Sequence, residues 1–211
     1  FASQGDYGGV KRELMSFDVA KRAVDFLIQM SGTRQHCEID FFGGEPLLNW
    51  DVVKQTVEYI EQEAPKHNKI FKLTLTTNGM LLSQEKIDYV NEHKMSLVLS
   101  LDGREDVHNA MRPVAGSGAN SYEYIAKNLV NAVKQRHGLE YYVRGTYTHK
   151  NLDFTKDVLA MSDLGFEHLS MEPVVGEEGD YVLREEDWPT LEKEYETLAD
   201  IYLQRQKDGW G

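Results

Sequence analysis

Apolar and polar positions along the 211-residue chain follow two alternating periods. Segments with apolar residues three or four positions apart, typical of helices, are interleaved with short segments of alternating apolar and polar residues, typical of strands. The predicted strands cover residues 36–42, 71–77, 95–102, 141–148 and 166–172. The predicted helices cover 16–30, 49–64, 83–90, 122–137, 153–164 and 184–206, and a long loop is predicted at 104–120. About five strand–helix units in series predict an α/β fold with a parallel sheet, either doubly wound or a barrel.

The first predicted helix illustrates the helical pattern. Ser16 can cap its start, and Gly32 lies just past its end. Its apolar residues at helical spacing are Val19, Ala20, Ala23, Phe26, Leu27 and Met30. Of these, we expect Met30 to fill the core.

Each predicted strand has one apolar and one polar face. In the first strand, Ile39 and Phe41 share one face, and Glu38 and Asp40 share the other. The corresponding polar residues of the later strands are Thr74, Thr76, Asn78, Ser100, Asp102, Arg144, Thr146, Thr148, Ser170 and Glu172. Parallel sheets normally bury both faces under apolar residues, so a polar face favours a barrel interior that holds a polar ligand. A sheet with one wet face is the alternative.

Composition narrows the classes of partner. Hydrophobic residues make up 41% and charged residues 27%, which is typical of a globular protein, and the net charge is −12. Such a charge repels nucleic acid and anionic lipid, so we expect neither as a partner. No apolar run reaches the length of a membrane span. The single cysteine, Cys37, excludes an internal disulfide and a cysteine-rich metal site, and we expect a cytoplasmic location.

The most informative segment is Gly43-Gly44-Glu45-Pro46, directly after the first strand. Two glycines allow close approach of a backbone to a ligand, and a glutamate can accept hydrogen bonds from an ammonium. A plain strand-to-helix turn is the alternative. No Gly-x-Gly-x-x-Gly follows the first strand and no phosphate-binding loop of the Walker type is present, so a dinucleotide fold loses support.

Further polar groups stand at the carboxyl ends of the later strands, where parallel barrels place their sites. They are Thr77, Asn78, Ser100, Asp102, Arg144 and Glu172. Ser100 and Asp102 suit ribose hydroxyls. Arg144 suits a carboxylate, or is the counterion of Asp102 or Glu172. Together with Glu45, these groups match an amino acid joined to a nucleoside.

Several ordered motifs carry a resemblance to a known family. Gly43-Gly44-Glu45-Pro46, Thr77-Asn78-Gly79, Ser100-Leu101-Asp102-Gly103 with His108 and Arg112-Pro113, and Glu172-Pro173-Val174 occur in the order seen in radical S-adenosylmethionine (SAM) enzymes of the SPASM group. The resemblance implies a partial (β/α)6 TIM-like barrel with about five βα units in this chain. It also implies that Gly43, Gly44, Glu45, Pro46, Thr77, Asn78, Ser100, Asp102, Arg144 and Glu172 bind SAM.

The opening segment, residues 1–9, more specifically resembles thioether-forming peptide maturases, above all the SCIFF peptide maturases. We assign Asp6, Tyr7 and Arg112 as candidate substrate-binding residues, and assign no catalytic residue and no metal ligand. The family implies SAM, a [4Fe-4S] cluster, auxiliary [4Fe-4S] clusters, a precursor peptide and an electron donor such as flavodoxin or ferredoxin. SAM cleavage would give a 5′-deoxyadenosyl radical that takes a hydrogen from a peptide α-carbon, to which a cysteine sulfur then bonds.

One departure from the family is large, because the three-cysteine cluster loop, the first barrel strand and the SPASM region are absent. We therefore interpret residues 1–211 as a radical SAM core truncated at both ends, with cluster ligands upstream. Three alternatives remain: another SPASM-type enzyme that modifies peptides or proteins, a phosphate-handling barrel, and a non-catalytic peptide-binding barrel.

Overall fold

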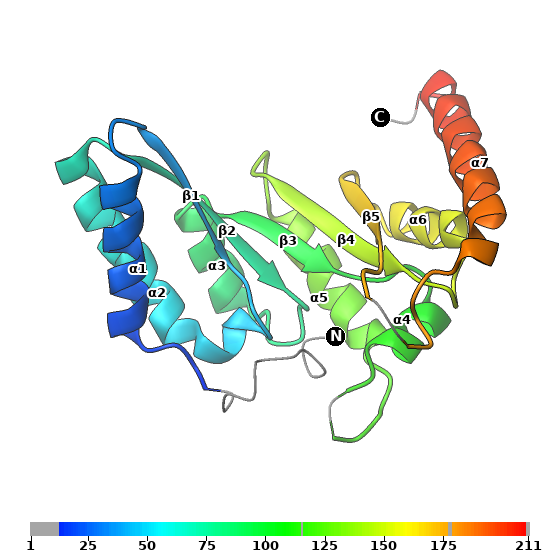
Figure 1. Cartoon of the computed structure of the whole chain (residues 1–211), viewed down its shortest axis with the longest axis horizontal. Helices are drawn as coiled ribbons and strands as arrows, with labels where there is room; N and C mark the ends of the chain where they lie inside the picture. Colours follow the sequence, from blue (N-terminus) through cyan, green and yellow to red (C-terminus); the bar gives the residue numbers. More distant parts are fainter. Residues whose placement is uncertain (1–12, 115, 177–178, 210–211) are drawn as a thin grey trace. The chain divides into compact units, whose positions relative to one another are not determined.

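The five strands form one sheet in the order β1-β2-β3-β4-β5 (Figure 1). The structure, a computed structural model, describes residues 13–114, 116–176 and 179–209. The strands are β1 (His36–Phe41), β2 (Ile70–Thr77), β3 (Ser96–Ser100), β4 (Tyr141–Tyr147) and β5 (Leu169–Pro173). β1 pairs in parallel with β2, and β4 with β5. The predicted α/β fold with a parallel sheet is confirmed.

Helices occupy the connections between the strands. The α-helices are α1 (Phe17–Met30), α2 (Trp50–Glu63), α3 (Gln84–Glu92), α4 (Glu105–Met111), α5 (Tyr122–Lys134), α6 (Phe154–Asp163) and α7 (Trp188–Lys207). Short 3-10 helices are η1 (Pro46–Asn49), η2 (Ala64–His67) and η3 (Glu185–Asp187). The helices α2 to α6 lie between consecutive strands, as the crossover connections of parallel strands require, whereas α1 precedes β1 and α7 follows β5.

The chain divides into two compact units. Unit 1 comprises Phe1–Val98 and Gln135–Glu140, and unit 2 comprises Leu99–Lys134 and Tyr141–Gly211. Unit 1 contains β1, β2 and α1 to α3, and unit 2 contains β4, β5 and α4 to α7. β3 contributes residues to both units.

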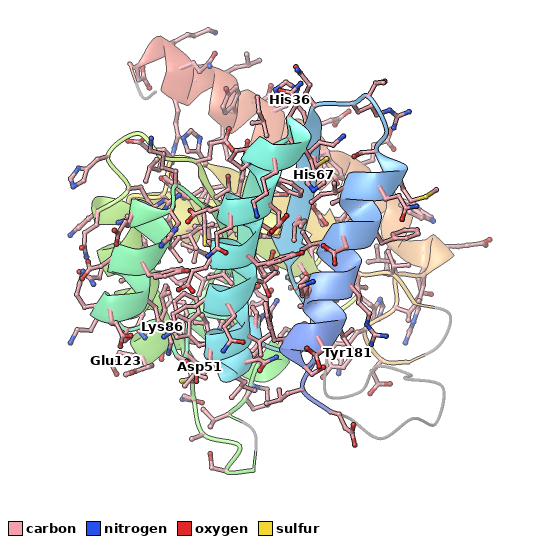
Figure 2. All side chains as sticks on the ribbon, turned by 90° about the vertical axis from the view of Figure 1, so that its left-hand side faces the viewer. His36, Asp51, His67, Lys86, Glu123 and Tyr181 are labelled. Atoms are coloured by element: carbon pink, nitrogen blue, oxygen red, sulfur yellow. The ribbon has the colours of Figure 1, made fainter. Side chains whose placement is uncertain are left out.

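In unit 1 the core lies between the helices and the apolar faces of β1 and β2. Val57 of α2 and Leu75 of β2 are fully buried. α1 and α2 lie side by side in both views, and α2 runs from Asp51 toward His67 at the end of the unit where His36 begins β1 (Figure 2). α2 therefore returns the chain to the amino end of β2, as a βα unit requires.

Unit 1 is closed by a buried arginine from its discontinuous segment. Arg136 is 2% exposed, and its guanidinium donates to the side chain of Asn91 and to the carbonyls of Met95 and Glu140. Burial lowers the pKa of Arg136 to about 10, so it stays cationic near neutrality. The bonds to Asn91 and Met95 fasten Gln135–Glu140 to the end of α3 and to the residue before β3.

In unit 2 the strand pattern separates buried from exposed residues in strict alternation. Along β4, Tyr141, Val143 and Tyr147 are buried, whereas Tyr142 and Arg144 are exposed. The ring of Tyr147 stacks on that of Phe154 of α6, with the centroids 4.5 Å apart, and Leu191 of α7 completes this cluster. The exposed polar residues of β4, like Glu38 and Asp40 of β1, do not point into the helical layer of their unit.

Two sequence predictions about helices are wrong. Residues 105–111 form α4 within the predicted loop 104–120, because seven residues are too few for a helical period to show. In α1 the buried face is Ala20, Val24 and Ile28. Met30, expected in the core, is exposed, as are Val19, Ala23 and Phe26. α1 carries apolar residues on more than one side, so spacing alone does not select the face.

Candidate functional site

In unit 1, the candidate SAM-binding loop follows the carboxyl end of β1. Glu45 lies at the start of η1, where Pro46 fits the first turn because its missing N–H would be unpaired there anyway. The Glu45 carboxylate accepts hydrogen bonds from the amides of Leu47 at 3.0 Å and Asn78 at 2.8 Å, and from the Thr77 hydroxyl at 2.8 Å. The structure therefore brings Glu45, Thr77 and Asn78 together, as the sequence predicts.

These contacts give Glu45 a structural role beside its predicted role in SAM binding, which stays a prediction. A carboxylate offers about four lone-pair sites, and three protein donors already occupy most of them. Thr77 and Asn78 are also engaged, because their side-chain oxygens accept the amides of Gly79 and Met80. The Glu45 side chain therefore clamps the loop after β1 to the end of β2.

The glycines before Glu45 leave backbone open to a ligand. Gly43 has φ +134°, a conformation that side chains with Cβ rarely adopt. Among the described residues, and apart from the chain neighbours, no atom lies within 4 Å of the position that a Cβ would take at Gly43 or Gly44. The residues present thus fit the head of an amino acid bound through backbone groups.

In unit 2, Asp102 and Arg112 bind each other. Asp102 is fully buried, and Arg112 donates from Nε to Oδ2 at 2.6 Å and from Nη2 to Oδ1 at 3.1 Å. The amide of Thr146 donates to the same Oδ1 at 3.2 Å. The structure pairs Asp102 and Arg112 with each other, and their predicted roles toward the ribose and the substrate stay predictions.

His108 lies behind this pair and is fully buried. Its Nδ1 accepts the Asp102 amide at 3.3 Å, and its ring meets the edge of Tyr122. Nε2 has no hydrogen-bond partner in the part of the chain that the structure describes. Burial lowers the pKa of His108 to about 4, so the ring is neutral.

A second ion-pair network in unit 2 was not predicted from the sequence. Arg104 donates from Nε to Asp157 at 2.7 Å and from Nη2 to Asp153 at 2.7 Å. Asp157 is fully buried, and Gly103 lies so close that an added Cβ would stand 2.2 Å from the Asp157 Cβ. Asp153 and Asp157 lie four residues apart on one helix face, but nothing in the sequence links that spacing to Arg104.

The remaining predicted residues of unit 2 are more accessible. Arg144 Nε lies 3.2 Å from Glu172 Oε1, and both side chains are about half exposed. Glu172 also accepts a hydrogen bond from Ser170, and Ser100 at the end of β3 is half-buried. Arg144 thus pairs with Glu172, one of the counterions considered for it, and its role in SAM binding stays a prediction. Asp6 and Tyr7 lie outside the described residues.

One group of ligand-type side chains lies outside the predicted set. His149, Glu186 and Asp187 bring ligand atoms within 4.8 Å of one another among the described residues. His149 Nδ1 and Asp187 Oδ2 are 2.8 Å apart, whereas two ligands of one zinc ion stand about 3.3 Å apart. The contact is therefore a hydrogen bond, and we assign no metal to it.

The chain's own residues do not fit an iron–sulfur cluster. A [4Fe-4S] cluster is held by cysteine thiolates, and the chain has one cysteine, Cys37. Cys37 is buried near the start of β1, whereas the glycine loop follows the end of that strand. No chemical step is assigned to a cluster held by these residues.

Comparisons with known proteins agree with the glycine loop and the parallel sheet described above. Residues 3–159 match the profile of the radical SAM superfamily. An uncharacterized protein of Methanocaldococcus jannaschii is 24% identical over 143 residues, which are 68% of this chain and 47% of that protein. The radical SAM cyclopropyl synthase TigE of Paramaledivibacter caminithermalis is 24% identical over 121 residues, 56% of this chain and 24% of that protein.

Another relative is the cysteine-type anaerobic sulfatase-maturating enzyme of Clostridium perfringens strain 13, 33% identical over 78 residues, 36% of this chain and 21% of that enzyme. Among solved structures, native anSMEcpe with bound AdoMet and Kp18Cys peptide superposes with a TM-score of 0.82 at 22% identity, covering 96% of this chain and 56% of that one. The alignments span less than half of these curated relatives. The matched profile covers most of this sequence, and the chain belongs to the radical SAM superfamily.

Proposed function

We propose that the whole protein is a radical SAM peptide maturase that forms a sulfur-to-α-carbon thioether in a ribosomally made peptide. The observation that carries the SAM part is the open backbone of Gly43 and Gly44, held by the Glu45 clamp, in a chain of the radical SAM superfamily. SAM and a [4Fe-4S] cluster would supply a radical able to take a hydrogen atom from carbon.

The residues of this chain would bind and orient SAM. Backbone groups at Gly43 and Gly44 would receive the amino acid head, and Glu45 would keep that loop in place through Thr77 and Asn78. Ser100, Asp102, Arg144 and Glu172 remain predicted SAM-binding residues of unit 2. We also propose that the cluster thiolates come from residues outside this chain, since Cys37 cannot supply them.

A peptide substrate is supported by the relatives. One similar structure contains a peptide, and one similar sequence is a sulfatase-maturating enzyme. The thioether itself rests on the resemblance of residues 1–9 to the SCIFF maturases. Auxiliary clusters and a flavodoxin or ferredoxin donor belong to the same proposal.

The test uses the whole protein under anaerobic conditions with SAM, a reductant and a cysteine-containing candidate peptide. We expect 5′-deoxyadenosine and a peptide lighter by two hydrogen atoms, with fragmentation that locates a sulfur–α-carbon bond. A different mass change would favour another SPASM-type modification. Failure of the protein to form 5′-deoxyadenosine would favour a non-catalytic barrel.

A further inference from the structure

A histidine at the carboxyl end of β4 is held by a buried aspartate. His149 Nδ1 lies 2.9 Å from Oδ1 and 2.8 Å from Oδ2 of Asp187, which precedes α7 and is 3% exposed. The His149 amide donates to the Tyr181 carbonyl at 3.1 Å. Ring and backbone of His149 are therefore both fixed within unit 2, at the strand end where parallel barrels carry their chemistry.

This pairing selects one tautomer of the ring. Asp187 is an acceptor, because it also accepts the Arg184 amide at 2.8 Å and its pKa is lowered by that bond and by His149, against the effect of burial. Nδ1 must then carry the hydrogen, which leaves the Nε2 lone pair available. No partner for Nε2 is found within the described ranges, and the side chain is 26% exposed.

Asp187 is the counterion of the His149 ring, because the neighbouring charged side chains pair with other groups. Lys150 lies 3.8 Å from Asp180 and over the Tyr181 ring, and Arg184 lies 3.5 Å from Glu186. The nearby cations thus have acidic or aromatic partners of their own. A proton that arrives on Nε2 would be balanced by the buried carboxylate, as in an aspartate–histidine dyad.

We propose that His149 is the proton acceptor for the peptide thiol, with Asp187 as its positioning residue. The S–H bond breaks, its electron pair stays on sulfur, and the proton forms a bond to Nε2. The products are a thiolate and an imidazolium paired with Asp187. Bonding of this sulfur to a carbon radical would release one electron, for which the auxiliary clusters of the proposed function would be the acceptor. This inference rests on the proposed function, because it takes a cysteine of the peptide as the group that loses the proton.

Two substitutions in the whole protein test the dyad. His149→Gln removes the base, and Asp187→Asn keeps an acceptor for the Arg184 amide but offers Nδ1 an N–H, which reverses the tautomer. We expect each to slow thioether formation by about 100-fold or more, while 5′-deoxyadenosine forms as in the parent. His93→Gln is the matched control, since His93 Nδ1 also pairs with a carboxylate, that of Glu61 at 2.7 Å, within unit 1.

A second readout does not depend on turnover. Nitrogen-15 NMR of the His149 ring should show hydrogen on Nδ1 in the parent and on Nε2 in Asp187→Asn. Unchanged thioether formation in both variants, or a parent ring protonated at Nε2 and not at Nδ1, overturns the proposal. A parent that forms no 5′-deoxyadenosine overturns the proposed function instead, and the NMR result still decides whether the dyad exists.

Discussion

Arg112 donates to both carboxylate oxygens of Asp102, and the pair fastens the residue after α4 to the second residue beyond β3. Asp102 is fully buried, whereas the Arg112 side chain is 25% exposed. The Ser121 hydroxyl donates to the Arg112 carbonyl at 2.6 Å, so the chain before α5 joins the same contact. Two charges that the sequence assigns to ligands therefore organise the carboxyl end of β3.

Arg112→Gln should be strongly destabilising, because it leaves the Asp102 carboxylate buried without its cation. We expect a loss of about 3 kcal/mol in the free energy of unfolding, measured by urea denaturation, the lower part of the range for broken buried pairs since Arg112 is partly exposed. Arg144→Gln is the control and should cost no more than about 1 kcal/mol, as its pair with Glu172 is half exposed. Equal losses in the two variants would contradict this assignment.

Glu45→Ala should loosen the glycine loop and weaken SAM binding through that loop. The substitution removes the acceptor of three hydrogen bonds and leaves the Asn78 amide and the Thr77 hydroxyl without it. In the whole protein we expect SAM affinity, measured by calorimetry, to fall by about 1.5–3 kcal/mol. Glu45→Gln keeps one acceptor oxygen and should lose less. An unchanged SAM affinity in Glu45→Ala would show that this loop does not contribute to SAM binding.

Gly103→Ala should be among the most damaging single substitutions in unit 2. An added Cβ would stand 2.2 Å from the Asp157 Cβ, and Gly103 has φ +103°. Gly165→Ala is the matched control, because Gly165 has φ +88° but nothing within 4 Å of the added atom. We expect the control to lose about 1 kcal/mol from the backbone alone, and Gly103→Ala to lose at least about 1–3 kcal/mol more from overpacking. Urea denaturation compares the two, and similar losses would refute the close approach.

Stability should fall in mild acid because of His108. Its pKa is lowered to about 4 by burial, so the unfolded chain binds a proton below about 6.5 that the folded protein does not. This contribution is complete above pH 6.5 and is lost as the pH falls toward 4, by about 3 kcal/mol in all. His108→Gln keeps an acceptor for the Asp102 amide and should show a shallower decline between pH 7 and 4.5. An identical decline in both proteins would contradict a buried neutral ring.

Local patterns predicted the helix and strand order, and the motifs predicted which residues of unit 1 meet. Glu45, Thr77 and Asn78 come together because the carboxyl ends of parallel neighbours adjoin. The pairing of Asp102 with Arg112 could not be read in this way. A charged residue near a strand end can serve a ligand or an internal partner, and only side-chain placement distinguishes the two.

Other contacts that the sequence did not predict also depend on tertiary packing. Arg104 and Asp157 are far apart in the sequence, and no periodic signal connects them. His149 follows β4, and Asp187 directly precedes α7. Because the two residues lie far apart in the sequence, no local motif links them. In α1, Phe26 and Met30 lie on the exposed side because tertiary packing, not spacing, chooses the buried stripe.

The discontinuity of unit 1 has a consequence for biosynthesis. Arg136 reaches Asn91 and Met95 only after the intervening segment Leu99–Lys134 has been made. A chain emerging from the ribosome can form β1, β2 and their helices early, but unit 1 lacks its closing bonds until Glu140 has left the exit tunnel. Unit 1 therefore cannot complete its packing until part of the later chain has been made, and contacts of long sequence separation of this kind slow folding.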